Sequence, residues 1–285
     1  MTLFTDRAGR LSWLKTLTLA GLVLPVAYLA YRYWTFDLGP LPVKEALLMC
    51  GLWAVRFLVV TLALTPAQRI LNWPKLALVR RMTGIGAFSY AALHFTLYIV
   101  NSKFDLGFVA SEIVLRFYLT IGFVALFGFS LLAATSTDWA VRKLGRRWKQ
   151  LHRIVYGVAV LGLLHFFLQS KIDVSQATLM AGLFFTLMIY RAAIAWRIRL
   201  SGATLALCAV AGALATVIAE FAWYGLTTGV DPWRIAEANF MLAYGLRPAA
   251  IVALAGLGVA GIPMVRALWA KPASPRAGEA LRSPG

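Results

Sequence analysis

The 285-residue chain has few acidic residues and few charged residues of any kind. It contains 11 Asp and Glu against 28 Lys and Arg, and charged residues make up only 14% of the sequence. A soluble domain needs a polar surface, which a chain that is 61% hydrophobic, with a mean hydropathy of +0.75, cannot provide. The composition therefore excludes an ordinary soluble protein and predicts a polytopic membrane protein.

Cysteine is almost absent as well. The two cysteines, Cys50 and Cys208, lie in apolar stretches, which supports neither a disulfide framework nor a thiolate metal site. We expect both to be buried packing residues. The chain also lacks a glycine-rich dinucleotide fingerprint and any loop long enough for a soluble domain. Any nicotinamide chemistry must then come from a separate protein.

The net charge of +17 raises the question of a nucleic-acid partner. Nucleic-acid binding needs basic residues gathered on a folded polar surface, whereas here they lie in short loops between apolar runs. We therefore expect a lipid bilayer and no nucleic acid.

An all-α bundle of about eight transmembrane helices is the predicted fold. Each apolar run of about 18 residues or more is long enough to cross a bilayer. The N-terminal run has basic residues before it, like a signal sequence, but its apolar core is long and no small-residue cleavage site follows, so we expect a retained helix. The eight runs lie near residues 17–34, 46–64, 82–100, 117–134, 151–168, 177–196, 204–224 and 249–269.

Lys and Arg are distributed unevenly between the two sets of predicted loops. The N-terminus, the loops at 65–81 and 135–150, the stretch 191–199 and the C-terminal tail carry most of them, and acidic residues favour the opposite loops. Because basic loops resist translocation, we predict that both termini face the cytoplasm.

Histidine is the most informative of the scarce residues. His94 lies 12 residues into the span 82–100, and His165 lies 14 residues into the span 151–168, which runs in the same direction. The two side chains should therefore share one level of the membrane, where a polar group is costly unless it is used. A neutral imidazole is a good axial ligand for heme iron, so we predict a heme held by His94 and His165. The alternative is a hydrogen bond from each histidine to a neighbouring helix.

The third histidine, His152, begins the fifth predicted span, 13 residues before His165. That spacing places it about 20 Å lower along an ideal helix and about 140° around it. Either the helix bends, near Gly157 or Gly162, or His152 serves a group that is offset from the upper heme. The sequence thus predicts one heme. A second heme at the level of His152 stays open, but no other histidine lies at that level.

Three other polar side chains lie in the predicted spans. Arg80 precedes His94 by 14 residues, on nearly the same helix face, and is a good partner for a propionate or a phosphate. Arg56, near mid-membrane, needs a partner, which could be a heme propionate, a quinone carbonyl or a hydrogen-bond network. For Glu220 we favour a solvated carboxylate near the outer interface over a carboxyl that exchanges protons with a quinol.

Several short motifs lie within about residues 45–200. They are LTP at 64–66, RRMTG at 80–84, YAALH at 90–94, TST at 135–137, LG at 144–145, Trp148, LHR at 151–153, VY at 155–156 and LHF at 164–166. Together they resemble the ferric-reductase-like transmembrane family, in particular its MsrQ (YedZ) branch.

This resemblance implies a six-helix heme domain over residues 1–200. Two additional helices in 201–270 lie beyond the matched stretch, and the Pro, Ala, Gly and Ser content predicts a disordered cytoplasmic tail in 271–285. It implies an electron-transfer subunit of the bacterial inner membrane, with b-type heme associated with His94, His152 and His165, and with FMN. The donor would be the quinone pool or a cytosolic flavin reductase. The acceptor would be a periplasmic molybdopterin methionine sulfoxide reductase. Trp148 could stack on the flavin ring, although an interfacial anchor explains it better.

Other functions stay open. A ferric-chelate reductase or superoxide-forming oxidase would share the heme, but such proteins usually carry a fused flavin and nicotinamide domain and four histidines. A proton-coupled transporter would use the same polar residues without heme, yet the sequence has no evident internal repeat. A structural or assembly subunit is the third possibility. We expect an electron conduit that is not itself the catalytic subunit.

Overall fold

The computed structural model describes residues 4–5, 9–171, 173–241 and 245–269, and the predicted disordered tail at 271–285 lies outside them. The described chain is helical, apart from an isolated bridge between Thr5 and Leu11. The elements are α1 Trp13–Trp34, α2 Pro42–Ile70, η1 Pro74–Leu78, α3 Arg80–Asn101, α4 Leu106–Leu115, α5 Phe117–Ala134, α6 Asp138–Leu144, α7 Arg146–Leu151, η2 His152–Ile154, α8 Val155–Ser170, α9 Ser175–Ala195, α10 Gly202–Thr227, α11 Pro232–Ala238 and α12 Pro248–Trp269.

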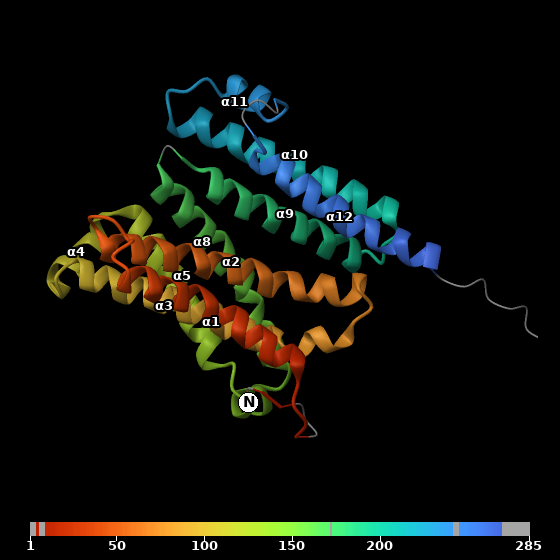
Figure 1. The fold of residues 1–285 in the computed structure, drawn as a ribbon, viewed down its shortest axis with the longest axis horizontal. Coiled ribbons are helices and arrows are strands. Elements are labelled where there is room, and N and C mark those ends of the chain that lie inside the picture. Colours follow the sequence, from red (N-terminus) through yellow and green to blue (C-terminus); the bar gives the residue numbers. More distant parts are fainter. Residues whose placement is uncertain (1–3, 6–8, 172, 242–244, 270–285) are drawn as a thin grey trace, which may run out of the picture.

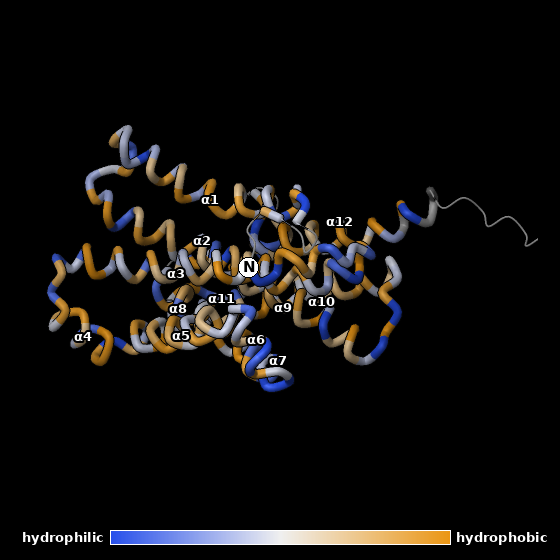
Figure 2. Tube along the Cα trace, turned by 90° about the horizontal axis from the view of Figure 1, so that it is seen from below, coloured by the Kyte–Doolittle hydropathy of each residue, from blue (hydrophilic) through white to orange (hydrophobic). Residues whose placement is uncertain are grey.

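The prediction of an all-α membrane bundle is confirmed. Within the described residues, seven helical segments are long and apolar enough to cross a membrane, and they coincide with the first seven predicted spans. The eighth predicted span, 249–269, coincides with α12, a helix of 22 residues. Hydrophilic residues gather at α6 and α7 and at turns between the long helices (Figure 2). The long helices themselves are suited to lipid, because a helix satisfies its backbone polar groups internally.

The helices form two groups that meet at α9 (Figure 1). Helices α2 and α3 pack as one hairpin, and α5 packs on α8. Helix α9 contacts α2 and α8 as well as α10 and α12. It therefore joins the part of the chain that holds the histidines to the last two long helices. The predicted domain boundary at residue 200 falls between α9 and α10 and stays a prediction.

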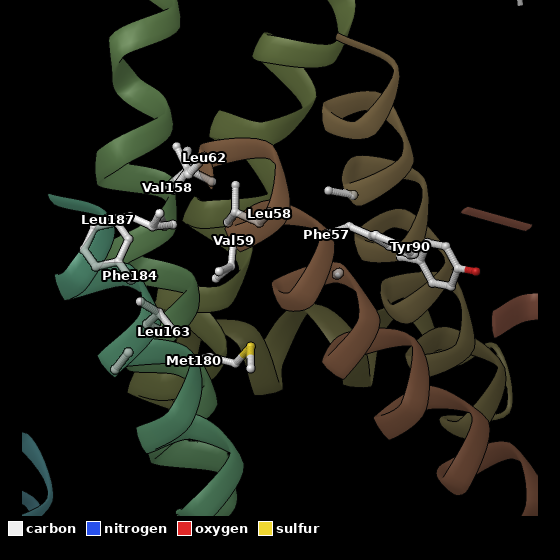
Figure 3. Close-up of a cluster of buried hydrophobic side chains, with 14 of the residues drawn as sticks. Phe57, Leu58, Val59, Leu62, Tyr90, Val158, Leu163, Met180, Phe184 and Leu187 are labelled. Carbon is white, nitrogen blue, oxygen red and sulfur yellow. The ribbon is translucent and has the colours of Figure 1, made fainter. Parts of the chain in front are cut away.

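Buried apolar side chains of α2, α3, α8 and α9 form one cluster, part of which Figure 3 shows. The labelled members of this core are Phe57, Leu58, Val59, Leu62, Tyr90, Val158, Leu163, Met180, Phe184 and Leu187. Between α9 and α10 the contact is made by small residues, where Gly182 faces Thr216 and Gly212 faces Thr186. Small residues let helix backbones approach closely in a membrane, where the hydrophobic effect does not drive association.

One sequence expectation about the fifth span needs correction. His152 and His165 do not lie on one continuous α-helix, because α7 ends at Leu151 and a 3₁₀ turn, η2, carries residues 152–154 before α8 begins at Val155. A 3₁₀ turn has about 3.0 residues per turn instead of 3.6, which changes the direction of the side chains that precede α8. The irregularity lies before Gly157 and Gly162, where a bend had been expected.

Candidate functional site

His94 of α3 and His165 of α8 face each other inside the bundle. Their ring centres are 6.3 Å apart, and the ring planes are inclined at 78°. Both histidines line a cavity of about 730 Å³ between α2, α3, α5 and α8, which we call the histidine cavity. The predicted pairing of these two residues at one level of the membrane is therefore what the structure contains.

The same backbone contact orients both imidazoles. His94 Nδ1 lies 2.8 Å from the carbonyl oxygen of Leu47, and His165 Nδ1 lies 2.7 Å from the carbonyl oxygen of Tyr118. A carbonyl oxygen only accepts hydrogen bonds, so each Nδ1 donates and carries the proton. Each Nε2 then keeps its lone pair, which is the state that a metal-ligating histidine requires.

A glycine faces each of these rings. A Cβ atom at Gly51 would lie 2.8 Å from Nδ1 of His94, and a Cβ atom at Gly122 would lie 2.6 Å from Nδ1 of His165. Each glycine lies four residues after the carbonyl that accepts the imidazole proton, which is one helical turn. The glycine leaves room for the ring, and the carbonyl one turn earlier fixes its orientation.

This construction occurs twice with one spacing. His94 follows Gly51 by 43 residues, and His165 follows Gly122 by 43 residues. Other residues that line the histidine cavity are related by the same offset of 71 between the two halves. These pairs are Leu47 and Tyr118, Leu48 and Leu119, Leu52 and Phe123, Ala54 and Ala125, Val55 and Leu126, and Phe95 and Phe166. The hairpin α2–α3 and the pair α5–α8 thus repeat one design, which the sequence analysis did not detect.

A second cavity, of about 800 Å³, adjoins the first, and Leu58 and Phe129 line both. We call it the basic cavity, because one acidic side chain, Asp138, lines it together with six cationic ones. The cationic side chains are Lys15, Arg80, Arg81, Lys149, Arg153 and Arg191. Such an excess of positive charge favours an anionic ligand.

His152 and Trp148 line the basic cavity together. Their rings stack at 3.8 Å with an interplanar angle of 25°. His152 Nε2 is hydrogen-bonded with Thr135 Oγ1 at 3.1 Å, and Trp148 Nε1 donates to the carbonyl oxygen of Thr135 at 2.8 Å. His152 thus differs from the other two histidines, whose contacts are made through Nδ1, and Trp148 is more than an anchor at a helix end.

Three arginines of the basic cavity differ in their partners. Arg80 donates to Thr65 Oγ1 at 3.4 Å. Arg191 donates to the hydroxyl of Tyr156 and to a backbone carbonyl, each at 2.8 Å, while its buried Nε has no hydrogen-bond partner. Arg81 pairs with Asp138 at 2.5 Å, and this hydrogen bond lowers the pKa of the Asp138 carboxyl below its ordinary value. Arg80 thus lines the same cavity as His152.

Arg56 stands apart from these residues and lines neither cavity. Its Nη2 donates to Gln176 Oε1 at 3.2 Å, and its guanidinium lies 4.8 Å from the centre of the Trp53 ring. Gln176 does line the histidine cavity. Of the partners expected for Arg56, the structure contains the hydrogen bond to a neighbouring helix.

The expectation of a solvated carboxylate at Glu220 is wrong. Its residue surface is 1% exposed, and Arg247 Nη2 lies 2.5 Å from Oε1 while Asn239 Nδ2 donates to Oε2 at 2.7 Å. Asn239 is the C-cap residue of α11, a helix that lies beside the end of α10 (Figure 1), and Arg247 directly precedes α12. A charge can remain buried when it is paired and hydrogen-bonded in this way.

The histidine cavity fits an iron porphyrin. Two metal–imidazole bonds of about 2.0 Å, with about 1.2 Å from each nitrogen to its ring centre, separate two axial imidazoles by about 6.4 Å, close to the 6.3 Å observed. No group of three or more His, Cys, Asp or Glu in the described segments could hold a metal ion by itself. An iron here would need equatorial ligands from elsewhere, which a porphyrin supplies.

The fold and the paired histidines define a multi-span membrane protein of the ferric-reductase-like class. Residues 50–163 match the family described as "Ferric reductase like transmembrane component". The chain belongs more specifically to the MsrQ family, as its curated relatives establish.

Three of these relatives carry the name "Protein-methionine-sulfoxide reductase heme-binding subunit MsrQ". The relative from Rhodospirillum rubrum is 39% identical over 199 residues, which are 69% of this chain and 93% of the relative. The one from Herminiimonas arsenicoxydans is 36% identical over 70% of this chain and 93% of its own length. The one from Caulobacter vibrioides is 37% identical over 59% of this chain and 80% of its own length. No solved structure matches the chain.

The sequence analysis missed the residues that support the two paired histidines. These are Gly51, Gly122 and the carbonyls of Leu47 and Tyr118. The repeated Gly-to-His spacing of 43 residues was the available signal. The carbonyls carry no side-chain signature at all.

Proposed function

We propose that this chain is a heme b electron-transfer subunit that delivers electrons across the bacterial inner membrane to a periplasmic methionine sulfoxide reductase. The observation that carries the proposal is the pair His94 and His165, whose ring centres are 6.3 Å apart in a cavity of about 730 Å³. The names of the relatives, which call them heme-binding subunits, support the proposal independently.

His94 and His165 are the proposed axial ligands. Their Nδ1 protons are held by the carbonyls of Leu47 and Tyr118, so neither ring has to change tautomer or turn to present Nε2. The apolar side chains that make up most of the lining suit the uncharged parts of a porphyrin. Bound heme iron would supply reversible one-electron chemistry at this level of the membrane.

The basic cavity is the proposed site of a second, anionic cofactor, either FMN or a second heme. Arg80 would contact its phosphate or propionates, and Trp148 offers an aromatic face beside His152. Leu58 and Phe129 are the only lining residues shared by both cavities among the described residues. A cofactor in one cavity would thus be separated from one in the other by about a side-chain layer.

Orientation and partners complete the proposal. By the positive-inside rule, the excess of Lys and Arg around the basic cavity supports a cytoplasmic position for this cavity and for both termini, with the histidine cavity toward the periplasm. Electrons would come from the quinone pool or a cytosolic flavin reductase. Arg56 lies outside both cavities and suits a quinone carbonyl better than a heme propionate.

The stoichiometry is simple. Reduction of one sulfoxide to a thioether consumes two electrons and two protons and releases one water. The subunit would pass the two electrons singly to the molybdopterin enzyme, where the protons are taken up and the S–O bond breaks. None of the described residues of this chain is needed for that bond cleavage, so the subunit would be a conduit.

The proposal is tested on the wild-type protein purified in mild detergent. We expect b-type bands in the dithionite-reduced minus oxidised spectrum and at least one heme per chain by pyridine hemochrome. The reduced heme should be reoxidised by methionine sulfoxide only when the periplasmic reductase is present. A protein without heme, even after reconstitution with hemin, would refute the proposal and favour a transporter.

His152→Ala distinguishes cofactor binding in the basic cavity from heme binding in the histidine cavity. Because His152 does not line the histidine cavity, we expect the heme of His94 and His165 to keep its spectrum and its amount. Occupancy of the basic cavity should fall, measured as flavin or as any heme beyond one per chain. Loss of all heme in this variant would mean that His152, and not the 6.3 Å pair, dominates heme retention.

A further inference from the structure

The histidine cavity extends to the turns at one end of the bundle, away from the basic cavity. The turn between α1 and α2 lies between Arg32 and Glu45, and both of these residues line the cavity. The turn between α3 and α4 lies between Tyr98 and Glu112, which line it as well. We call this end, defined by these four residues, the cavity mouth. None of the described residues between α10 and α12 lines the cavity, so the mouth belongs to the histidine-bearing part of the chain.

Each of these two turns holds a phenylalanine in the left-handed backbone conformation. The φ angle is 56° at Phe36 and 61° at Phe104. Bulky residues rarely adopt such angles, which cost on the order of 1–3 kcal/mol. The cost is not offset by burial of the rings, because Phe36 is 94% exposed and Phe104 is 68% exposed. The turns therefore hold two aromatic rings outward at an energetic cost.

Both rings are tied to the walls of the cavity mouth. Asp37, the residue after Phe36, pairs with Arg32 at 2.9 Å. Asp105, the residue after Phe104, caps the start of α4 by accepting a hydrogen bond at 2.9 Å from the backbone N–H of Phe108. Figure 1 shows α4 and the turn between α1 and α2 at the same end of the bundle. The two rings thus flank one opening.

Negative charge exceeds positive charge at the cavity mouth. The two arginines that line the histidine cavity are each paired with an acid, Arg32 with Asp37 and Arg116 with Glu112. Glu45 and Asp173 line the cavity in addition. Hydrogen bonds from Ser175 lower the pKa of the Asp173 carboxyl, so it carries its charge at neutral pH. The surface around the mouth therefore favours a basic partner.

We infer that the cavity mouth, with Phe36 and Phe104, is the docking surface for the soluble protein that accepts the electrons, and that this partner presents a basic face with apolar sites for the two rings. Exposed aromatic side chains are typical anchors of protein interfaces. An acidic mouth has little to offer a bilayer surface, because peripheral binding to lipid relies on positive charge.

The inference rests on the proposed function and adds where the electron leaves. A partner seated on the mouth would lie over the cavity of His94 and His165 with no further helix between. Each transfer would oxidise one heme iron from ferrous to ferric and reduce the cofactor of the acceptor by one electron.

Phe36→Asn combined with Phe104→Asn tests the inference. Asparagine tolerates the left-handed conformation, so the turns should stay intact while both rings are removed. Binding of the periplasmic methionine sulfoxide reductase to the protein in nanodiscs of neutral lipid is measured by biolayer interferometry, and we expect its Kd to rise at least tenfold. The second-order rate at which the reductase and methionine sulfoxide reoxidise the reduced heme should fall by a similar factor. Reoxidation by ferricyanide, a small oxidant that needs no docking, should keep its wild-type rate.

Three further measurements isolate the cause. Phe240→Asn removes an aromatic ring that is 79% exposed but follows α11, away from the mouth, and should bind as wild type does. Replacing Phe36 and Phe104 by tyrosine keeps both rings and should preserve the affinity. Association with wild type should slow as salt is added, and Glu45→Gln with Asp173→Asn should weaken this salt dependence.

Unchanged affinity and an unchanged reoxidation rate in the double asparagine variant would overturn the inference and assign the two rings to the bilayer surface. An equal loss in Phe240→Asn would overturn it too, because exposed aromatics in general and not the mouth would then matter. Failure of the proposed function looks different, since wild type itself would then hold no heme or would not be reoxidised through the reductase.

Discussion

Replacing Gly51 or Gly122 by alanine is expected to remove heme almost as completely as replacing His94 or His165. A Cβ atom at either glycine would lie 2.8 Å or 2.6 Å from the Nδ1 atom of the facing imidazole, closer than side-chain carbon atoms approach in folded proteins. The ring must move, and its hydrogen bond to the backbone carbonyl is lost with it. His94→Ala and His165→Ala remove the ligand itself and should leave no bis-imidazole signal.

The size of the glycine effect follows from the role of that hydrogen bond. Loss of the partner that orients a metal-ligating histidine costs on the order of 10- to 100-fold in affinity. Here the ring is also displaced from the position that places its partner ring 6.3 Å away. We expect the amount of bound heme to fall at least tenfold, measured by pyridine hemochrome, and any residual heme to shift its reduction potential.

Gly157→Ala is the matched control. Gly157 lies on α8, the helix of His165, and an added Cβ would meet no atom within 4 Å. Alanine also favours a helix by about 1 kcal/mol over glycine, so this variant should keep its heme and be no less stable than wild type. Wild-type heme content in Gly51→Ala and Gly122→Ala would show that the imidazoles are not held by the contact described here.

Much of the fold follows from composition and period alone. Span 117–134, for example, coincides with α5 because an apolar run of that length has no other stable place. The pairing of His94 and His165 was predictable too, since two parallel spans set their depth. The depth of a residue in the membrane follows from its position along its helix, and this position can be counted without knowing which helices pack beside it.

What could not be predicted depends on contacts between segments. The kink before α8 is a 3₁₀ turn at His152, where the stacked Trp148 and the hydroxyl of Thr135 hold the ring. A helical wheel assumes 3.6 residues per turn and cannot contain such a turn. The carbonyls of Leu47 and Tyr118 escape for another reason, because every residue has a carbonyl and only packing selects two of them.

Glu220 shows how a residue near a span end can be misjudged. Its position near the end of its span suggested contact with water, but Arg247 and Asn239 reach the carboxylate. Those partners lie 27 and 19 residues further along the chain. Counting residues along the span of Glu220 cannot predict which residues so far along the chain come back to it.

Arg247→Met is therefore expected to be among the most destabilising substitutions in the last three helices. It would leave the buried Glu220 carboxylate with the hydrogen bond from Asn239 but without its ion pair, and breaking a buried pair from one side costs about 3–5 kcal/mol. The midpoint of thermal unfolding in detergent, followed by circular dichroism, should fall clearly. The heme should stay, because neither residue of the pair lines the histidine cavity.

Two comparisons separate this effect from a simple loss of charge. Arg234→Met removes an exposed arginine whose ion pair with Asp231 spans 3.9 Å, and surface pairs of this kind contribute at most about 1 kcal/mol, so its midpoint should match wild type. Combining Arg247→Met with Glu220→Gln removes both charges and should recover a large part of the loss, because the cost arises from the unpaired carboxylate. If the double variant were as unstable as Arg247→Met alone, the cost would instead come from lost packing around the Arg247 side chain.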